Sequence, residues 1–459
     1  MPDPSDFSFT RVFLKGEAAH GFWSVATKFL GFANALFILS ALTLYEYGAF
    51  QLLMASYAFM TLAMSLPSGG SVAVNDILRF TGAKKEAEAK RLFAEHSLVG
   101  VSAGIGLFAV VFFGAPLLSF RFGSEFIAVI RLTSFLFLHE AFWAVAKPLL
   151  QARLQFSRLA SRPALTKLVQ LGLLAAFVRL GGLGVWEVML SQIAASFLTA
   201  LSVIPSLVRS YRPWRGLAMS RQYQLPRIFR TYGKWSFLET GAAQAAGFLQ
   251  PWLTKILIST EAVAIFSMAE RIIQSFKDFL PAKTLSTLIP LVLEDRAKSQ
   301  RVFSYGAKYL VILSVALAGA AFFVVPPIVG YFFVQYRDAL PIFTLLLVTL
   351  PLTALGVMPT LFLAALRERK ALFYLRLVKV SVEVTLLVIL LPVFGLWGLA
   401  LKDILLQIVN VSTHLWRVKK TILGARLKGR DFFSFEQADA AFLKTFWQSG
   451  WAFIRRRAG

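Results

Sequence analysis

Long apolar segments recur along the whole chain, and a short polar or basic stretch closes each of them. A segment of about 20 apolar residues is long enough to cross the hydrocarbon core of a bilayer as an α-helix. The approximate spans are 20–44, 47–67, 97–117, 128–149, 163–180, 186–208, 233–258, 262–291, 306–332, 340–366, 371–394 and 398–416. The pattern predicts an all-α membrane protein with about 12 transmembrane helices.

The composition agrees with lipid as the solvent for most of the chain. Of the 459 residues, 57% are hydrophobic, and the mean hydropathy is +0.66. Residues 1–17 lack a short apolar core followed by a small-residue cleavage site, so we expect no cleaved signal peptide. The absence of cysteine excludes disulfides, thiolate metal sites and cysteine nucleophiles, and the four histidines have no metal-ligand spacing.

The net charge of +24 would suggest nucleic-acid binding in a soluble protein, so its distribution along the chain decides its meaning. If the N-terminus is cytoplasmic, the cytoplasmic connections hold about 35 Lys and Arg and the opposite connections about 2, namely Arg121 and Arg337. The positive-inside rule therefore predicts that both termini are cytoplasmic. The basicity mostly reflects topology, and we expect no nucleic-acid partner.

An internal repeat relates the two halves of the chain. Gly21-Phe-Trp-Ser24 recurs as Gly233-Lys-Trp-Ser236, about 212 residues later. Weaker matches near this offset pair residues 45–50 with 260–265, Pro148 with Pro359, Lys167 with Lys379 and Gly182 with Gly395. Six spans per repeat is an even number, so both halves enter the membrane in the same sense and are related by an axis along the membrane normal.

The repeat predicts four regions. Residues 1–208 form one six-helix bundle, 209–232 a basic cytoplasmic linker and 233–420 a second six-helix bundle. Residues 421–459 form a basic amphipathic cytoplasmic tail, in which aromatic residues alternate with polar ones before Arg455-Arg-Arg457. This tail either lies on the membrane surface or packs against the cytoplasmic loops.

Charged residues inside the predicted eighth span, 262–291, are the clearest functional signal. A charge at mid-bilayer costs about 2.5–3.5 kcal/mol on insertion scales, so it requires a partner, a route to the surface or an aqueous cavity. At 3.6 residues per turn, one arc of this helix holds Ser267, Glu270, Arg271, Gln274, Lys277 and Asp278. Pro281 marks a place where the helix bends.

The first and seventh spans carry milder polar faces. Lys28 lies well inside the first span, and Glu239 and Gln250 share a face of the seventh. The other members of these faces are Ser24, Gly31 and Ala35, and Ser236, Ala243, Ala246, Gly247 and Thr254. Because the repeat makes the two helices equivalent, we expect their polar faces to look at each other across the symmetry axis. Small residues there allow either close packing or a water-lined groove.

Two interpretations of the eighth helix remain open. Its charged face lines a water-accessible cavity, or Glu270, Arg271, Lys277 and Asp278 form local ion pairs that neutralise one another.

Charged residues elsewhere in the spans have simpler explanations. Arg179, Lys255 and Lys402 lie near helix ends, where snorkelling is the expected behaviour. For His139 and Glu140 we expect helix–helix hydrogen bonding.

No motif of a catalytic site or a nucleotide-driven motor occurs. The sequence lacks G-x-x-x-x-G-K-[ST] and H-E-x-x-H, and the predicted connections leave no room for a nucleotide domain. The protein is therefore expected not to be an enzyme, and to drive movement by coupling to H+, Na+ or the membrane potential, without a cofactor or a metal site.

Several short motifs carry a resemblance to a known family. They are Tyr45-Glu-Tyr-Gly48, Gly82-Ala-Lys-Lys85, Ala269-Glu-Arg271 and Leu391-Pro-Val-Phe-Gly-Leu-Trp-Gly398, after a basic N-terminal segment. Over residues 10–420 the chain resembles the Wzx-type polysaccharide flippases of the MOP superfamily, which also contains MATE drug exporters and lipid II flippases.

The resemblance implies a V-shaped bundle of two six-helix halves in the bacterial inner membrane. It implies alternating access and transfer of an undecaprenyl-pyrophosphate-linked oligosaccharide from the cytoplasmic to the outer leaflet, with a polysaccharide polymerase or glycosyltransferases as partners. A cationic central cavity would receive this substrate. The candidate substrate-binding residues are Lys28, Arg271, Lys277, Gln274 and Gln250, and the candidate coupling or gating residues are Glu239, Glu270 and Asp278.

Three other functions agree less well with the sequence. A MATE-like exporter of small cations shares the topology but requires an anionic pocket. A membrane glycosyltransferase or polymerase would show a large outer loop with acidic catalytic residues, and the outer connections predicted here are short. A purely structural bundle would not need so many charges in its interior.

Overall fold

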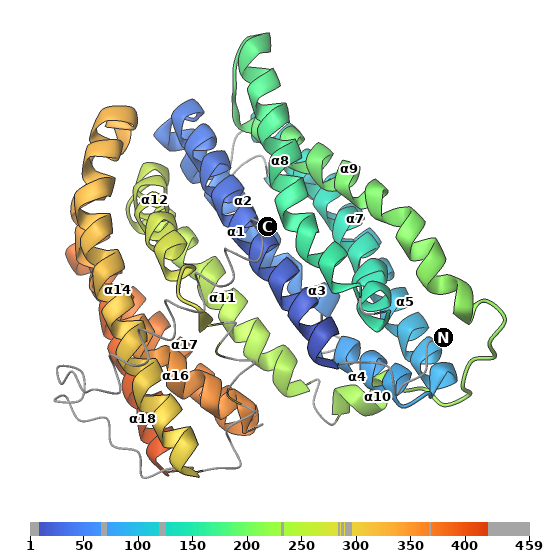
Figure 1. Cartoon of the computed structure of the whole chain (residues 1–459). Coiled ribbons are helices and arrows are strands. Elements are labelled where there is room, and N and C mark those ends of the chain that lie inside the picture. The colour runs from blue at the N-terminus through green and yellow to red at the C-terminus, as the bar shows by residue number, and fades with distance from the viewer. Residues whose placement is uncertain are drawn as a thin grey trace, which may run out of the picture.

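The computed structural model is built from long α-helices in two groups, one from each half of the chain (Figure 1). It describes residues 9–65, 71–118, 125–153, 155–230, 234–282, 285, 289, 296–366 and 369–420. The predicted tail, residues 421–459, lies outside this range. The all-α fold class is confirmed.

The first group contains α1 (Phe9–Ala41), α2 (Leu44–Met60), α3 (Leu62–Ser65), α4 (Ser71–Gly82), α5 (Glu86–Gly114), α7 (Glu125–Ala152), α8 (Phe156–Leu180) and α9 (Val185–Tyr211). Short elements η2 (Ala115–Leu118), η3 (Arg212–Trp214) and α10 (Leu225–Ile228) accompany it. The second group contains α11 (Lys234–Leu257), α12 (Thr260–Lys277), α14 (Arg296–Phe332), η6 (Val334–Tyr336), α15 (Ala339–Leu346), α16 (Thr349–Ala365), α17 (Arg369–Phe394) and α18 (Leu396–Val418).

Hydropathy separates the long helices into two kinds. In the described parts of the chain, nine segments are long and apolar enough to cross a membrane. The predicted spans 233–258, 262–291 and 398–416 correspond to α11, α12 and α18, which are more polar and are not among those nine. These three helices bring the fold to about twelve crossings, and all three carry interior charges.

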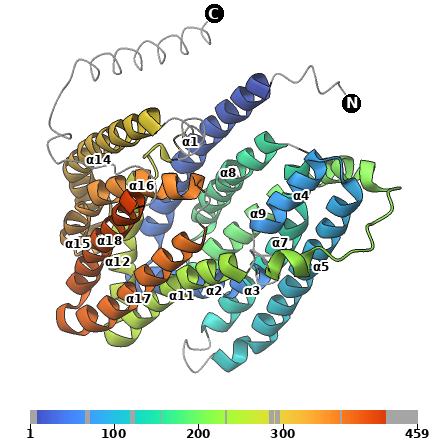
Figure 2. The ribbon, with the colours of Figure 1, turned by 90° about the horizontal axis from the view of Figure 1, so that it is seen from below.

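The same helix pairs pack together in both halves (Figure 2). Helix α1 packs against α8 as α11 packs against α17, and α5 packs against α7 as α14 packs against α16. Two sequence matches fall at equivalent points of this arrangement. Pro148 and Pro359 lie inside α7 and α16. Gly182 and Gly395 have φ of 148° and 57° in the turns before α9 and α18, where a residue with a Cβ would be strained.

The predicted eighth helix is shorter than its apolar pattern suggested. Helix α12 ends at Lys277, with Asp278 as its C-cap, and not near residue 291. The amides of Phe279 and Leu280 bond to carbonyls three residues back, at 3.1 Å each, which tightens the last turn. Pro281 follows this turn and stops the helix, because it has no N–H to continue the bonding pattern. The bend expected at Pro281 is therefore wrong, because this residue lies beyond the end of the helix.

The basic segment after α9 is folded onto the first half. The indole of Trp214 is buried and donates a hydrogen bond to Glu86, which also pairs with Arg153 at 3.4 Å. Glu95 accepts from the backbone amide of Leu225 at 2.8 Å, at the start of α10. The region boundaries at 208, 232 and 420 stay a prediction.

The two halves meet along α2, which packs against α12 at its beginning and against α11 further along, where Trp252 donates to Ser56 at 3.0 Å. The beginnings of α2 and α12 are the outer end in the predicted topology. Thr43 and Ser259 cap the two helices by accepting from backbone amides three residues on. A Cβ on Gly48 of α2 would lie 2.0 Å from the carbonyl oxygen of Thr260, so only glycine permits this approach. Gln335 adds a second contact between the halves, because its amide donates to the carbonyls at the outer end of α1.

Replacing Gly48 by Ala is therefore expected to force α2 away from α12. Overpacking of this kind costs about 1–3 kcal/mol, so the unfolding temperature of the purified protein should fall. Gly172→Ala on α8 is the matched control, because nothing lies within 4 Å of the added Cβ. Equal unfolding temperatures for Gly48→Ala and Gly172→Ala would contradict the close contact.

Candidate functional site

The three polar helices converge near the middle of the bundle, where two cavities open on either side of the α2–α12 contact. The larger, of about 720 Å³, lies between α1, α8 and α12. Its polar lining consists of Thr27, Lys28, Gln51, Lys167, Ser267, Glu270, Arg271, Gln274, Ser275 and Asp278. The smaller, of about 330 Å³, lies between α11, α12 and α17.

The larger cavity holds three cations from three helices: Lys28, Lys167 and Arg271. The ammonium of Lys28 donates to the backbone carbonyl of Asp278 and lies 5.5 Å from the ring centre of Phe279. Lys167 donates to the amide oxygen of Gln170 at 2.9 Å. Within the described residues, no carboxylate oxygen lies within 4.0 Å of any of these three cations. Their charges face the cavity without an ion-pair partner.

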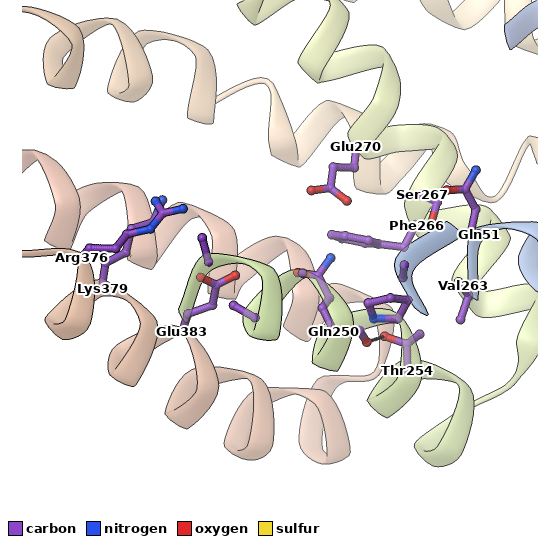
Figure 3. Close-up of a pocket in the computed structure, with 15 residues that line it drawn as sticks. Gln51, Gln250, Thr254, Val263, Phe266, Ser267, Glu270, Arg376, Lys379 and Glu383 are labelled. Atoms are coloured by element: carbon purple, nitrogen blue, oxygen red, sulfur yellow. Dashed lines mark hydrogen bonds between the residues drawn. The ribbon is translucent and has the colours of Figure 1, made fainter. Parts of the chain in front are cut away.

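The smaller cavity carries charges of both signs. Arg376, Lys379 and Glu383 extend from α17 toward Glu270 of α12 and Gln250 of α11 (Figure 3). Figure 3 shows the carboxylates of Glu270 and Glu383 directed into the same space as the Gln250 amide. The small residues of α11 predicted on this face, Ala243, Ala246 and Gly247, line the cavity. They form a groove at this point.

Lys402 of α18 is a buried cation in the second half, and it contacts carboxylates of α17 and α18. Its side chain is 0% exposed and lies 2.8 Å from Asp403 Oδ1 and 3.8 Å from Glu383 Oε1. Its ammonium also donates to the side-chain oxygen of Gln250. The expected snorkelling of Lys402 is therefore wrong. The carboxylates of Glu383 on α17 and Asp403 on α18 take the place of water around the ammonium, so the side chain does not have to extend to the headgroups.

The polar faces of α1 and α11 do not face each other across one space, as the repeat had suggested. Helix α1 lines the larger cavity and α11 the smaller. Three residues line both cavities: Gln51, Ser267 and Glu270. Helices α2 and α12 cross between α1 and α11, so the interior is divided at their contact.

The predicted site residues divide among these spaces. Four line the larger cavity: Lys28, Arg271, Gln274 and Asp278. Gln250 lines the smaller cavity, and Glu270 lines both. Lys277 and Glu239 line neither. Lys277 is in electrostatic range of Asp403 and Glu270, and Glu239 lies one turn before Ala243 on the same face of α11.

The local ion pairs considered for α12 do not form in this structure. Gln274 donates to Asp278 Oδ1 at 3.1 Å, and Asp278 accepts from Lys28 through its backbone. Among the described residues, neither Arg271 nor Lys277 has a carboxylate oxygen within 4.0 Å.

Four charged residues of these cavities were not among the predicted site residues: Lys167, Arg376, Lys379 and Glu383. A signal for two of them was present in the sequence, since Lys167 and Lys379 are matched by the internal repeat. In the structure each lies on the equivalent helix, α8 or α17, and each lines one cavity. A cation kept at the same position in both repeats was therefore a sequence signal for these two cavity residues.

Comparison with known proteins places the fold. The sequence profile of a family described as polysaccharide biosynthesis protein matches residues 41–303. No curated protein matches the chain by sequence. An inward-facing multidrug-resistance MATE transporter of the MOP superfamily has a TM-score of 0.68 at 17% identity, covering 86% of this chain and 96% of that chain.

Two further structures share this fold. The lipid II flippase MurJ, in an inward closed conformation, has a TM-score of 0.67 at 14% identity and covers 95% of this chain and 93% of that one. A MOP superfamily transporter from Pyrococcus furiosus, whose reverse polarity of binding pocket suggests a different function, has a TM-score of 0.56 at 16% identity. That alignment covers 88% of this chain and 93% of the other. The V-shaped MATE-like architecture predicted from the sequence is thereby confirmed.

Single cysteines on α12 should report the water in the larger cavity. The natural chain has no cysteine, so each substitution stands on a clean background. We expect Gln274→Cys to react with a membrane-impermeant thiol reagent, because Gln274 is exposed in the cavity, and Ile273→Cys to be protected, because Ile273 is buried. Equal protection at both positions would show a dry interior.

Removing the Lys402 ammonium should leave Glu383 and Asp403 without the buried cation that lies within 4.0 Å of both. Lys402→Met is expected to destabilise the protein by about 3–5 kcal/mol, the cost of breaking a buried pair on one side. Adding Glu383→Gln and Asp403→Asn should restore most of the loss, measured as unfolding temperature. A triple variant no more stable than Lys402→Met would contradict this network.

Proposed function

Because the chain belongs to the polysaccharide biosynthesis protein family, we propose that it is a flippase for a lipid-linked glycan. The substrate would be an undecaprenyl-pyrophosphate-linked oligosaccharide, moved from the cytoplasmic to the outer leaflet of the bacterial inner membrane. A polysaccharide polymerase and glycosyltransferases would act on the same glycan, and no nucleic acid would be bound.

The observation that carries this proposal is the set of unpaired cations in the larger cavity. Lys28, Lys167 and Arg271 come from three helices, and Lys28 and Lys167 donate to carbonyl and amide oxygens. Glu270 and Asp278 line the same cavity, but among the described residues no carboxylate oxygen lies within 4.0 Å of these three cations. A cation in a partly desolvated cavity attracts an anion much more strongly than it does in bulk water. A pyrophosphate, with several acceptor oxygens and more than one negative charge, is the type of group that satisfies such a site.

The second cavity supports a transfer route through the middle of the bundle. Arg376 and Lys379 place two more cations on the far side of the α2–α12 contact. The repeat relates Lys379 to Lys167, so the anionic headgroup would find similar partners on both halves. Opening the contact at Gly48 would expose the cavities to the outer side, and opening the opposite end would expose them to the cytoplasm. Alternating access would consist of exchange between these two states.

Carboxylates of the interior would couple transport to an ion gradient or to the membrane potential. Glu270 is the leading candidate, because it lines both cavities next to cations of both halves. Protonation of Glu270 would change the balance of charge that the substrate meets. Glu239 and Asp278 are retained as further coupling or gating positions, with Asp278 closer to the cations because its backbone accepts from Lys28. Lys277 would complete the cationic set from the side of Asp403.

A MATE-like exporter of small cations is the competing function, because its fold is shared. An organic cation would have to enter a cavity in which three cations outnumber the carboxylates Glu270 and Asp278. The polarity of the larger cavity therefore favours an anionic substrate.

Replacing Lys28 or Arg271 by Ala should reduce transport by about tenfold or more, because each removes a charge-assisted contact with the pyrophosphate. The assay uses proteoliposomes that contain an undecaprenyl-pyrophosphate oligosaccharide, and measures the rate at which the sugar becomes accessible to an added lectin. Lys167→Ala should behave in the same way.

Arg179→Ala is the matched control for these variants, since Arg179 is exposed in the last turn of α8 and lines neither cavity. Each variant is first checked for a wild-type unfolding temperature. Wild-type transport in both Lys28→Ala and Arg271→Ala would refute the cationic site, and efflux of an organic cation by the purified protein would favour the exporter.

A further inference from the structure

A third cavity, of about 360 Å³, lies between α8 and α9, apart from the central pair of cavities. It is lined by Arg158, Ser161, Arg162, Leu165, Thr199, Ser202, Val203, Pro205, Ser206 and Arg209. This lining contains three guanidinium groups and several hydroxyls, and no carboxylate among the described residues. The central cavities, in contrast, mix cations with glutamate and aspartate.

The three arginines lie at one end of two antiparallel membrane spans. Arg158 and Arg162 belong to the first two turns of α8, and Arg209 to the last turn of α9. Figure 1 shows α8 and α9 side by side in the first half. In the predicted topology this end is cytoplasmic, so the arginines lie at the depth of the lipid headgroups.

Two residues of α7, His139 and Trp143, hold the side chain of Arg162 in place. Its guanidinium lies 2.7 Å from His139 Nε2 and 3.3 Å from the ring centre of Trp143. Trp143 donates to the same histidine nitrogen at 2.9 Å, and His139 Nδ1 lies 3.6 Å from Glu140. This confirms the expected helix–helix bonding of His139. A guanidinium fixed in this way loses little freedom when it binds an anion.

The other two arginines complete the cavity from both walls. Arg158 donates to the hydroxyl of Ser206 across the gap between α8 and α9, and to the side-chain oxygen of Gln155 at 3.3 Å. Arg209 is exposed and makes no hydrogen bond or ion pair to the described residues. Glu140, behind His139, is the carboxylate in electrostatic range of Arg162. The remaining positive charge is not balanced by the cavity lining.

Apolar side chains continue from this cavity along the two spans. The exposed ones nearest the lining residues by helical rotation are Leu165 and Leu168 on α8 and Leu198 on α9. A soluble anion would gain nothing from this surface, whereas a lipid can place its phosphate among the arginines and its acyl chains along the leucines.

We propose that the α8–α9 cavity is a binding site for an anionic phospholipid of the cytoplasmic leaflet, with its phosphate held by Arg158, Arg162 and Arg209. This site is separate from the glycan route, and it does not depend on what the central cavities transport. Basic pockets between transmembrane helices on the cytoplasmic side are a known way to recognise anionic headgroups.

The test is native mass spectrometry of delipidated protein titrated with phosphatidylglycerol, with phosphatidylcholine of the same acyl chains, and with inorganic phosphate. Phosphatidylglycerol should bind more tightly than the other two. Arg158→Gln, Arg162→Gln and Arg209→Gln should each weaken its binding by about fivefold and leave phosphatidylcholine unchanged. Arg179→Gln, at the opposite end of α8, should bind like the wild type.

Arg162→Gln also removes contacts to His139 and Trp143, so this variant can lose lipid binding through a folding defect. Arg209→Gln separates the two effects, because it breaks no hydrogen bond or ion pair to a described residue. Wild-type binding of phosphatidylglycerol by both Arg158→Gln and Arg209→Gln would overturn the proposal. So would equal affinity for phosphatidylcholine, or phosphate binding that is as tight as lipid binding and sensitive to the same substitutions.

Discussion

A charge inside a membrane has to be hydrated or paired, and this constraint organises the interior of the protein. The chain satisfies it in two different ways on the two sides of α12. On the side of α17 and α18, Lys402 is paired with Glu383 and Asp403 and has no exposed surface. On the side of α1 and α8, Lys28, Lys167 and Arg271 face an open cavity. The first arrangement satisfies the charge by pairing, and the second leaves the three cations facing the cavity without a carboxylate partner among the described residues.

Backbone contact between the halves allows this asymmetry. At Gly48 the carbonyl of Thr260 occupies the place where a side chain would otherwise lie, and Gln335 bonds to the end of α1 nearby. The halves thus approach most closely where α2 and α12 begin, and α2 continues to pack against α11 beyond this point. Below it, Gln51, Ser267 and Glu270 are reached from both cavities. A change in the contact between α2 and α12 would therefore also move residues that line both cavities.

The sequence predicted the architecture well, because apolar segments of membrane length are a direct consequence of the bilayer. It also placed Lys28, Arg271, Gln274 and Asp278 on one face, and the structure brings all four to one cavity. The end of α12 was missed, since apolar residues beyond Lys277 hide a proline stop. The burial of Lys402 was missed because two of its partners, Glu383 and Gln250, lie on other helices. Periodicity within one helix carries no information about such tertiary neighbours.

The polarity of α11, α12 and α18 has a consequence for how the protein is made. Each charged residue near a helix centre adds about 2.5–3.5 kcal/mol to the cost of leaving the translocon for lipid. Two charged residues, Glu270 and Arg271, lie near the centre of α12, and Glu261 and Lys277 lie in its first and last turns. Helix α12 emerges from the ribosome before α17 and α18, which carry the charges that surround it in the finished protein. We therefore expect α12 to remain near the insertion machinery until α17 and α18 are synthesised, so that these helices enter the bilayer together.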